Sequence, residues 1–162
     1  MSYDSTDDTK AHIEQVRNVM ATVIYELAKR SLVHDASKLQ SPEKEMFDEY
    51  TPALRALTYG SKEYKETLAH MGKALQHHYE NNSHHPEYYG GEVGDMDLLD
   101  VIEMLCDWVA ATRRHADGSI RESLAINKKR FAISDQLYRI LCNTAVNMDW
   151  IPAAPAENYE PE

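Results

Sequence analysis

Four histidines stand close together in the sequence, in two adjacent pairs within the stretch HHYENNSHHPE. They are His77, His78, His84 and His85. Such a cluster is either a solvated polar turn or a set of nitrogen ligands, because neutral imidazole binds Zn, Mn, Fe, Co and Ni. Neighbours on a helix point about 100° apart, so one histidine of each pair should face a common centre. We expect His77 and His84 to be those two.

Carboxylates elsewhere in the chain could complete a mixed nitrogen and oxygen ligand set. Asp35 follows His34 in the stretch HDASK, and Asp107 lies in the apolar stretch MDLLDVIEMLCDWVAATRRH. A His-Asp dipeptide alone is common, but this chain also contains the two histidine pairs and Asp107. Mixed sets of imidazole and carboxylate are typical of hydrolytic and oxygen-activating metal sites. These residues therefore favour a metal site over a solvated turn.

The apolar stretch at 96–115 predicts a largely buried helix that carries three acids on one face. Asp100, Glu103 and Asp107 follow the spacing i, i+3, i+7. Buried carboxylates need cations or hydrogen bonds, since burying an unpaired charge costs several kcal/mol. For Asp100 and Glu103, a position on the solvent-exposed face of an amphipathic helix, without a functional role, is an equally weighted alternative. For Asp107 we favour a functional role.

Two glutamates are candidates for orienting the histidines from behind. A carboxylate that accepts the second ring N–H of a ligating histidine fixes its tautomer. Glu43 and Glu80 could serve in this way, and ordinary helix-surface acids are the competing interpretation. His70 lies seven residues before His77 and is expected to be a core or rim residue.

Length and composition indicate one globular domain rich in helix. The chain has 162 residues, 43% of them apolar, with only six glycines and six prolines. The net charge of −10 argues against a nucleic-acid polymer as partner. No apolar run approaches 18 residues, so neither a membrane span nor a membrane partner is expected, and the acidic N-terminus is unlike an ordinary signal peptide. Cys106 and Cys142 are expected to be buried thiols in a cytoplasmic protein.

Helical periodicity recurs along most of the chain, and no alternating strand pattern is present, so the fold class is all-α. Residues 1–9 are expected to be a disordered lead, 10–148 a single helical domain, and 149–162 a Pro-rich acidic tail. Within the domain, the expected helices cover 10–30, 42–49, 52–58, 62–82, 96–115, a segment that opens at Ser119, and 134–148.

The order of these groups resembles the H…HD…H…H…D signature of the HD-domain superfamily of metal-dependent phosphohydrolases. It is carried by His12, His34-Asp35, the two histidine pairs and Asp107. HDASK is similar to the HDxxK of the HD-GYP phosphodiesterases, although their Gly-Tyr-Pro motif is absent and their substrate is not carried over. The closest resemblance is to a family of small uncharacterised phage and bacterial proteins, which implies no activity.

The superfamily resemblance implies a compact helical bundle, one or two divalent ions and hydrolysis of a phosphorylated small molecule by metal-activated water. It implies that His12, His34, Asp35 and Asp107 hold a first ion. Asp35 would bridge to a second ion held by one histidine of each later pair. It also implies that Asp35 helps to activate the water and that Lys38 contacts the substrate phosphate. Further phosphate contacts would come from Arg114 and His115.

Three functions stay open at this point. The first is a phosphohydrolase acting on a nucleotide or deoxynucleotide, of nucleotidase or phosphodiesterase type. The second is a di-iron oxygenase, because one branch of the superfamily uses a similar ligand set to activate oxygen. The third is a non-catalytic metal-binding protein that serves as an accessory or interaction factor. The oligomeric state is open as well, and a homo-oligomer is one alternative.

Overall fold

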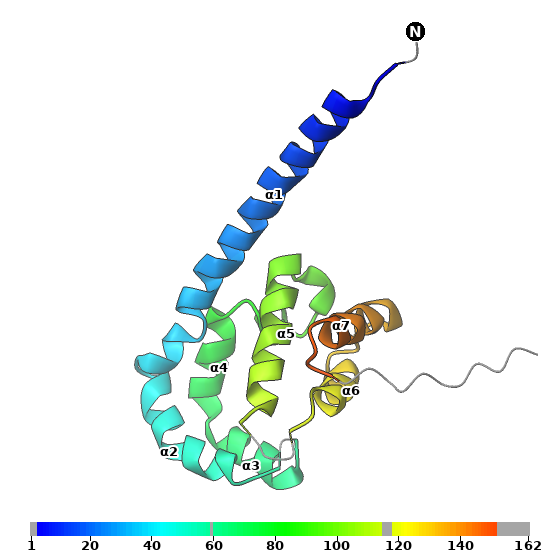
Figure 1. The fold of residues 1–162 in the computed structure, drawn as a ribbon. Helices are drawn as coiled ribbons and strands as arrows, with labels where there is room; N and C mark the ends of the chain where they lie inside the picture. The colour runs from blue at the N-terminus through cyan, green and yellow to red at the C-terminus, as the bar shows by residue number, and fades with distance from the viewer. Residues whose placement is uncertain (1–2, 59, 115–117, 152–162) are drawn as a thin grey trace, which may run out of the picture. The chain divides into compact units, whose positions relative to one another are not determined.

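A computed structural model describes residues 3–58, 60–114 and 118–151 (Figure 1). Within these ranges the secondary structure consists of α-helices and short 3-10 helices without strands, which confirms the all-α class. The chain divides into two compact units, Met1–His34 and Asp35–Glu162. No helix of the described ranges is long and apolar enough to cross a membrane.

The first unit is built around one long helix, α1 (Thr6–Val33). It begins before the expected position 10, so residues 6–9, expected to be disordered, are helical. Asp7 and Asp8 lie in its first turn and Arg30 in its last, which suits the helix dipole at both ends. None of the described side chains of α1 is buried.

The second unit contains six α-helices within its described residues. They are α2 (Glu43–Arg55), α3 (Lys62–His70), α4 (Gly72–Asn81), α5 (Leu98–Thr112), α6 (Ile120–Arg130) and α7 (Asp135–Asn147). Four of them begin at a residue whose side chain accepts a hydrogen bond from a first-turn N–H. Those N-caps are Ser61, Asp97, Ser119 and Ser134. The expected helix start at Ser119 is thereby confirmed.

The core of the second unit lies between α5, α6 and α7. Met104, Leu105, Leu124 and Leu141 are almost completely buried there. Trp108 is buried as well and stacks on Phe131. The apolar face of α5 therefore anchors this helix, and with it the acids that α5 carries.

The expected helix at 62–82 is divided into α3 and α4. Gly72 adopts a φ of +38°, a left-handed conformation that interrupts a right-handed helix and that glycine accommodates readily. After this turn, α4 packs against α2 and against the 3-10 turn η1 (Ala36–Leu39). That packing brings the end of α4 to the segment that follows Asp35.

Candidate metal centre

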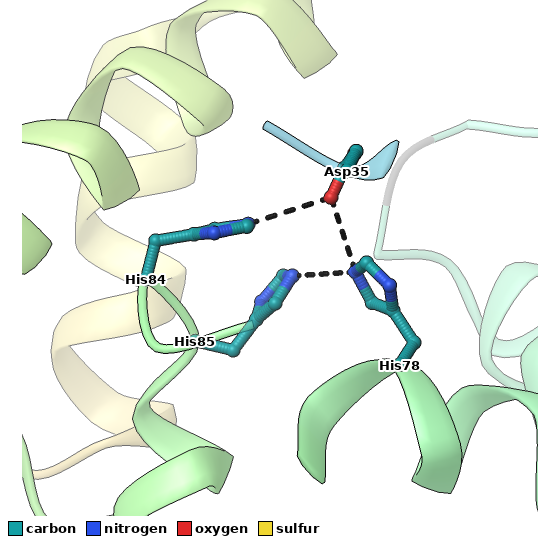
Figure 2. Close-up of side chains that lie close together, drawn as sticks. All are labelled: Asp35, His78, His84 and His85. Atoms are coloured by element: carbon teal, nitrogen blue, oxygen red, sulfur yellow. Dashed lines mark hydrogen bonds and ion pairs between the residues drawn. The ribbon is translucent and has the colours of Figure 1, made fainter. Parts of the chain in front are cut away.

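Four side chains from three segments of the second unit point toward one another (Figure 2). Asp35 precedes η1, His78 lies in the last turn of α4, and His84 and His85 lie in the loop after it. One ligand atom from each lies within 4.8 Å of the others. His78 and His84 are 1% and 2% exposed. The cluster is therefore an assembled interior site, and the solvated polar turn is the wrong interpretation for these residues.

The spacing of the donor atoms fits coordination to a single ion. His78 Nε2 lies 2.8 Å from His85 Nε2 and 3.3 Å from Asp35 Oδ1, and His84 Nε2 lies 3.5 Å from Asp35 Oδ1. Ligand atoms held about 2.1 Å from one ion lie about 3.0 Å apart at right angles and about 3.4 Å apart at tetrahedral angles. Small adjustments would suffice for three nitrogens and one oxygen to hold a divalent ion.

Asp35 occupies a special backbone position. Its φ of 57° and ψ of 16° lie in the left-handed region, which aspartate tolerates better than most residues. The conformation starts η1, where the Lys38 N–H donates to the Asp35 carbonyl. The Lys38 ammonium returns to Asp35 Oδ2 at 2.6 Å, so one carboxylate oxygen faces the histidines and the other faces the lysine.

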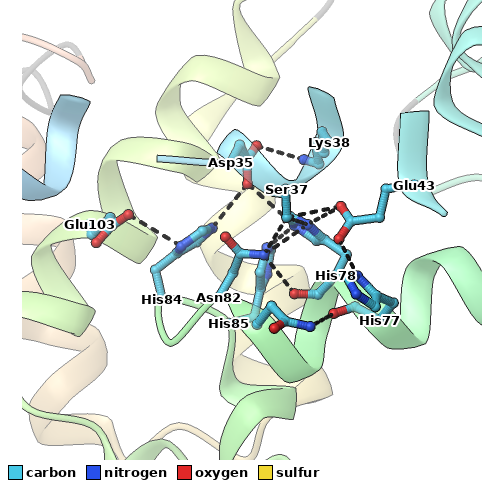
Figure 3. Close-up of polar contacts among 11 residues, drawn as sticks. Asp35, Ser37, Lys38, Glu43, His77, His78, Asn82, His84, His85 and Glu103 are labelled. Atoms are coloured by element: carbon cyan, nitrogen blue, oxygen red, sulfur yellow. Dashed lines mark hydrogen bonds and ion pairs between the residues drawn. The ribbon is translucent and has the colours of Figure 1, made fainter. Parts of the chain in front are cut away.

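Glu43 fixes the orientation of His78 from behind (Figure 3). Its fully buried carboxylate lies 2.9 Å from His78 Nδ1 and accepts a hydrogen bond from Ser37. A carboxylate at Nδ1 favours the tautomer that carries the proton on that nitrogen. The lone pair of Nε2, the atom that faces the cluster, is then available to a metal ion. Asn82 donates to Ser37 Oγ and to the His78 carbonyl, which ties the end of α4 to this group.

His84 has the same arrangement with a different acid. Its Nδ1 lies 3.2 Å from Glu103 Oε1 on α5, and its Nε2 faces Asp35. Two histidines of the cluster thus present Nε2 inward and are held at Nδ1 by carboxylates. This is the pattern by which proteins fix the tautomer and raise the basicity of ligating histidines.

Asp100 holds the base of the loop that carries His84 and His85. It is 1% exposed and accepts hydrogen bonds from Ser83 at 2.6 Å and from the Tyr89 hydroxyl at 2.7 Å. Asp100 also completes the capping box of α5 with Asp97. The buried face of α5 therefore fixes both ends of the 83–89 segment, and Asp100 is a structural acid.

His85 stays neutral at ordinary pH. Burial, followed by the neighbouring His84 and His78, lowers its pKa from 6.5 to about 3. Desolvation acts first because a buried imidazolium loses its hydration. Metal binding requires neutral imidazole, so no proton would have to be removed from a charged His85 near pH 7.

A cavity of about 190 Å³ opens beside the cluster within the second unit. His78, His85 and Asp107 contribute to its wall. Its lining also holds four basic residues and two acidic ones, although the whole chain is acidic. The basic residues are Lys38, Arg55, Arg114 and Arg130, and the acids are Glu87 and Asp107. This local excess of cations is suited to an anionic ligand.

The comparisons with known proteins place the chain in a family without giving it an activity. A family model described as a family of unknown function, DUF5662, matches residues 1–147. The chain belongs to this family. The searches of curated proteins and of solved structures return no match.

Of the first histidine pair, the structure brings His78 to the cluster, and not His77, which the sequence favoured. His77 points to Glu43, with Nδ1 2.7 Å from Oε1, and its side chain is 40% exposed, whereas His78 reaches the cluster. Both members of the second pair join it, because the pair lies in a loop and not on a regular helix. Of the two candidate glutamates, Glu43 approaches histidines, and Glu80 is exposed and accepts from Gln76.

Asp107 lies on α5, half-buried, with a carboxylate oxygen within 4.8 Å of one from Asp35. Glu103, left open by the sequence, faces His84. Ser37 and Asn82 are contacts that sequence reasoning missed, since neither type nor spacing distinguishes them from ordinary loop residues. Cys106 is exposed and Cys142 half-buried, so the expectation of two buried thiols is wrong.

His12 and His34 belong to the first unit. His34 is the residue at the C-terminal end of α1. Because α1 is continuous, a rise of 1.5 Å per residue separates His12 from this end by roughly 30 Å. The two histidines of one chain therefore cannot ligate a common ion, contrary to the expectation. Arg114 lines the cavity, and His115 lies outside the described residues.

Proposed function

We propose that the chain is a metal-dependent phosphohydrolase that acts on a small phosphorylated substrate, with nucleotides and deoxynucleotides as first candidates. The observation that carries the proposal is the convergence of Asp35, His78, His84 and His85 beside a cavity lined by basic residues. The HD-type order of these groups in the sequence adds support. His34, joined to Asp35 by a peptide bond, and Asp107 are proposed as further ligands.

The donor set suits a transition metal better than magnesium or calcium, which prefer oxygen ligands. Mn, Co, Fe, Ni and Zn are the candidates, as one ion or two. A divalent ion at this position would lower the pKa of bound water from about 15.7 toward 7 and so supply a nucleophile at neutral pH. Asp35 has one oxygen toward the histidines and can orient that water or accept its proton.

The residues that line the cavity support the second part of the proposal, that the substrate carries a phosphoryl group. Lys38 lies at its wall, held by Asp35 and placed over the Phe47 ring at 5.0 Å. From there, its ammonium can bind a phosphoryl oxygen, and Arg114 offers the planar fork that matches phosphate. Asp35 and Lys38 are thus the proposed catalytic pair. The cavity is below the usual range of about 300–1,000 Å³, so it would enclose a phosphoryl group and only part of a larger substrate.

The decisive experiment combines metal analysis with a substrate screen on protein purified without a histidine tag. We expect bound transition metal, and phosphate or nucleoside release from a nucleotide panel with Mn or Co. Asp35→Asn should abolish turnover and weaken metal binding by more than about 100-fold. Asparagine also tolerates the left-handed backbone of position 35, so the fold should be kept.

The matched control is Asp48→Asn, which removes an exposed carboxylate that pairs with Lys44 outside the cluster. It should leave metal binding and turnover unchanged. Absence of metal binding would contradict the proposal. Metal retention without turnover would favour a non-catalytic accessory role, and oxygen-dependent turnover with iron would favour the oxygenase.

A further inference from the structure

Helix α1 carries an apolar stripe that is open to solvent. Met20 is 58% exposed, Ile24 63% and Val19 65%. We define the α1 stripe as the apolar side chains of one face of this helix. They are Ile13, Val16, Val19, Met20, Val23, Ile24 and Leu27. Large contiguous apolar surfaces on a protein usually mark an interaction site.

The spacing within the α1 stripe indicates that its occupant is another helix. Positions 13, 16, 20, 23 and 27 alternate steps of three and four residues, as the seam of a coiled coil does. Such a seam accepts side chains of a facing helix between its own. Val19 and Ile24 flank the seam and widen it. An isolated helix is marginal in water, so its stability should come from packing of this face.

The charges of α1 indicate which helix that is. Residues 6–14 carry three acids and one lysine, a net charge of −2, and residues 26–33 carry two basic residues and one acid, a net charge of +1. A second α1 placed antiparallel brings the negative end of each helix to the positive end of the other. A parallel arrangement would bring the two negative ends together. Antiparallel helix dipoles also attract.

We propose that α1 pairs antiparallel with the α1 of a second copy of this chain through the α1 stripe. A two-fold axis makes such an interface self-complementary, because each copy contributes the same stripe and both charged ends. The interface does not involve the four residues of the metal cluster. The pairing therefore stands or falls independently of the proposed hydrolase activity.

Sedimentation equilibrium of the full chain tests the pairing. We expect a concentration-dependent dimer whose dissociation constant rises at least tenfold in Met20→Glu, since a charge would then be buried in the apolar seam. The matched control is Asn18→Glu, which adds the same charge to an exposed position on the opposite face of α1. Circular dichroism of both variants checks that α1 stays helical.

Removal of charge at the helix start tests the orientation. Asp7→Asn combined with Asp8→Asn takes the net charge of residues 6–14 from −2 to 0 and should weaken an antiparallel dimer severalfold at low ionic strength and much less at high salt. Tightening of the dimer would instead show parallel helices, whose negative ends would no longer repel each other, and would overturn the orientation. A chain that stays monomeric at all concentrations, or a dimer unaffected by Met20→Glu, would overturn the pairing itself.

Discussion

Helices α1 and α5 have similar apolar periodicity but opposite environments. None of the described side chains of α1 is buried, whereas α5 has seven buried residues, among them Met104 and Asp100. The difference lies in what each apolar face meets within the described units. The face of α5 meets α6 and α7, and its polar edge can then hold Asp100 and Glu103 in fixed positions. A precise site needs a helix that is packed into a core as α5 is, because ligand geometry depends on a rigid support.

The largest expected difference between the two helices is in the free energy of unfolding. Met104→Ala should lower it by about 2–5 kcal/mol, because a fully buried methionine leaves a cavity. Met20→Ala should change it by about 0.5 kcal/mol or less in dilute, monomeric protein, because its side chain is already 58% exposed. Urea titration of both variants measures the difference. Equal losses would show that α1 is packed as firmly as α5.

The next comparison concerns two glutamates that the sequence does not distinguish. Glu43→Gln should weaken metal binding about 10–100-fold, because an amide cannot replace a buried carboxylate that holds His77 and His78 at Nδ1. Glu80→Gln should change it less than about twofold, since Glu80 is exposed. Isothermal titration with Zn or Mn measures both affinities. Similar affinities for the two variants would remove Glu43 from the site.

Local patterns predict most of the helices and the general position of the site. The 3.6-residue periodicity and the cap at Ser119 are local signals, and both are confirmed. The break at Gly72 was missed because a single glycine is also tolerated inside a helix. The exposure of the apolar residues of α1 is not predictable from the sequence pattern. Periodicity identifies an apolar face but says nothing about what covers it.

The ligand side chains are harder to predict than the segment that holds them. The turn at 82–85 lets both His84 and His85 face Asp35, and no helical rule applies to such a turn. Glu43 and Glu103 reach His78 and His84 across separate elements, through contacts that sequence spacing does not encode. Residue type therefore predicts a metal-binding segment, and tertiary packing decides which atoms meet.

The smallest expected effect concerns the support of the loop by Asp100. Tyr89→Phe removes one hydrogen bond to a buried carboxylate and should lower the free energy of unfolding by about 1.5 kcal/mol. Tyr88→Phe is the matched control, and about 0.5 kcal/mol or less is expected there because the side chain is 48% exposed. Equal effects would show that the hydroxyl of Tyr89 contributes nothing specific.

The same hydrogen bond predicts a pH dependence in the alkaline range. The bond to Asp100, followed by burial and the charge of Asp100, raises the pKa of Tyr89 from 10.0 to about 12. The folded state then holds this proton more tightly than the unfolded state. Its contribution to stability is complete below pH 10 and is lost as the pH rises toward 12. The stability difference between wild type and Tyr89→Phe should therefore shrink from pH 9 to pH 12 in urea titrations, because the phenolate can no longer donate to Asp100. A constant difference over that range would show that the hydroxyl does not donate to the carboxylate.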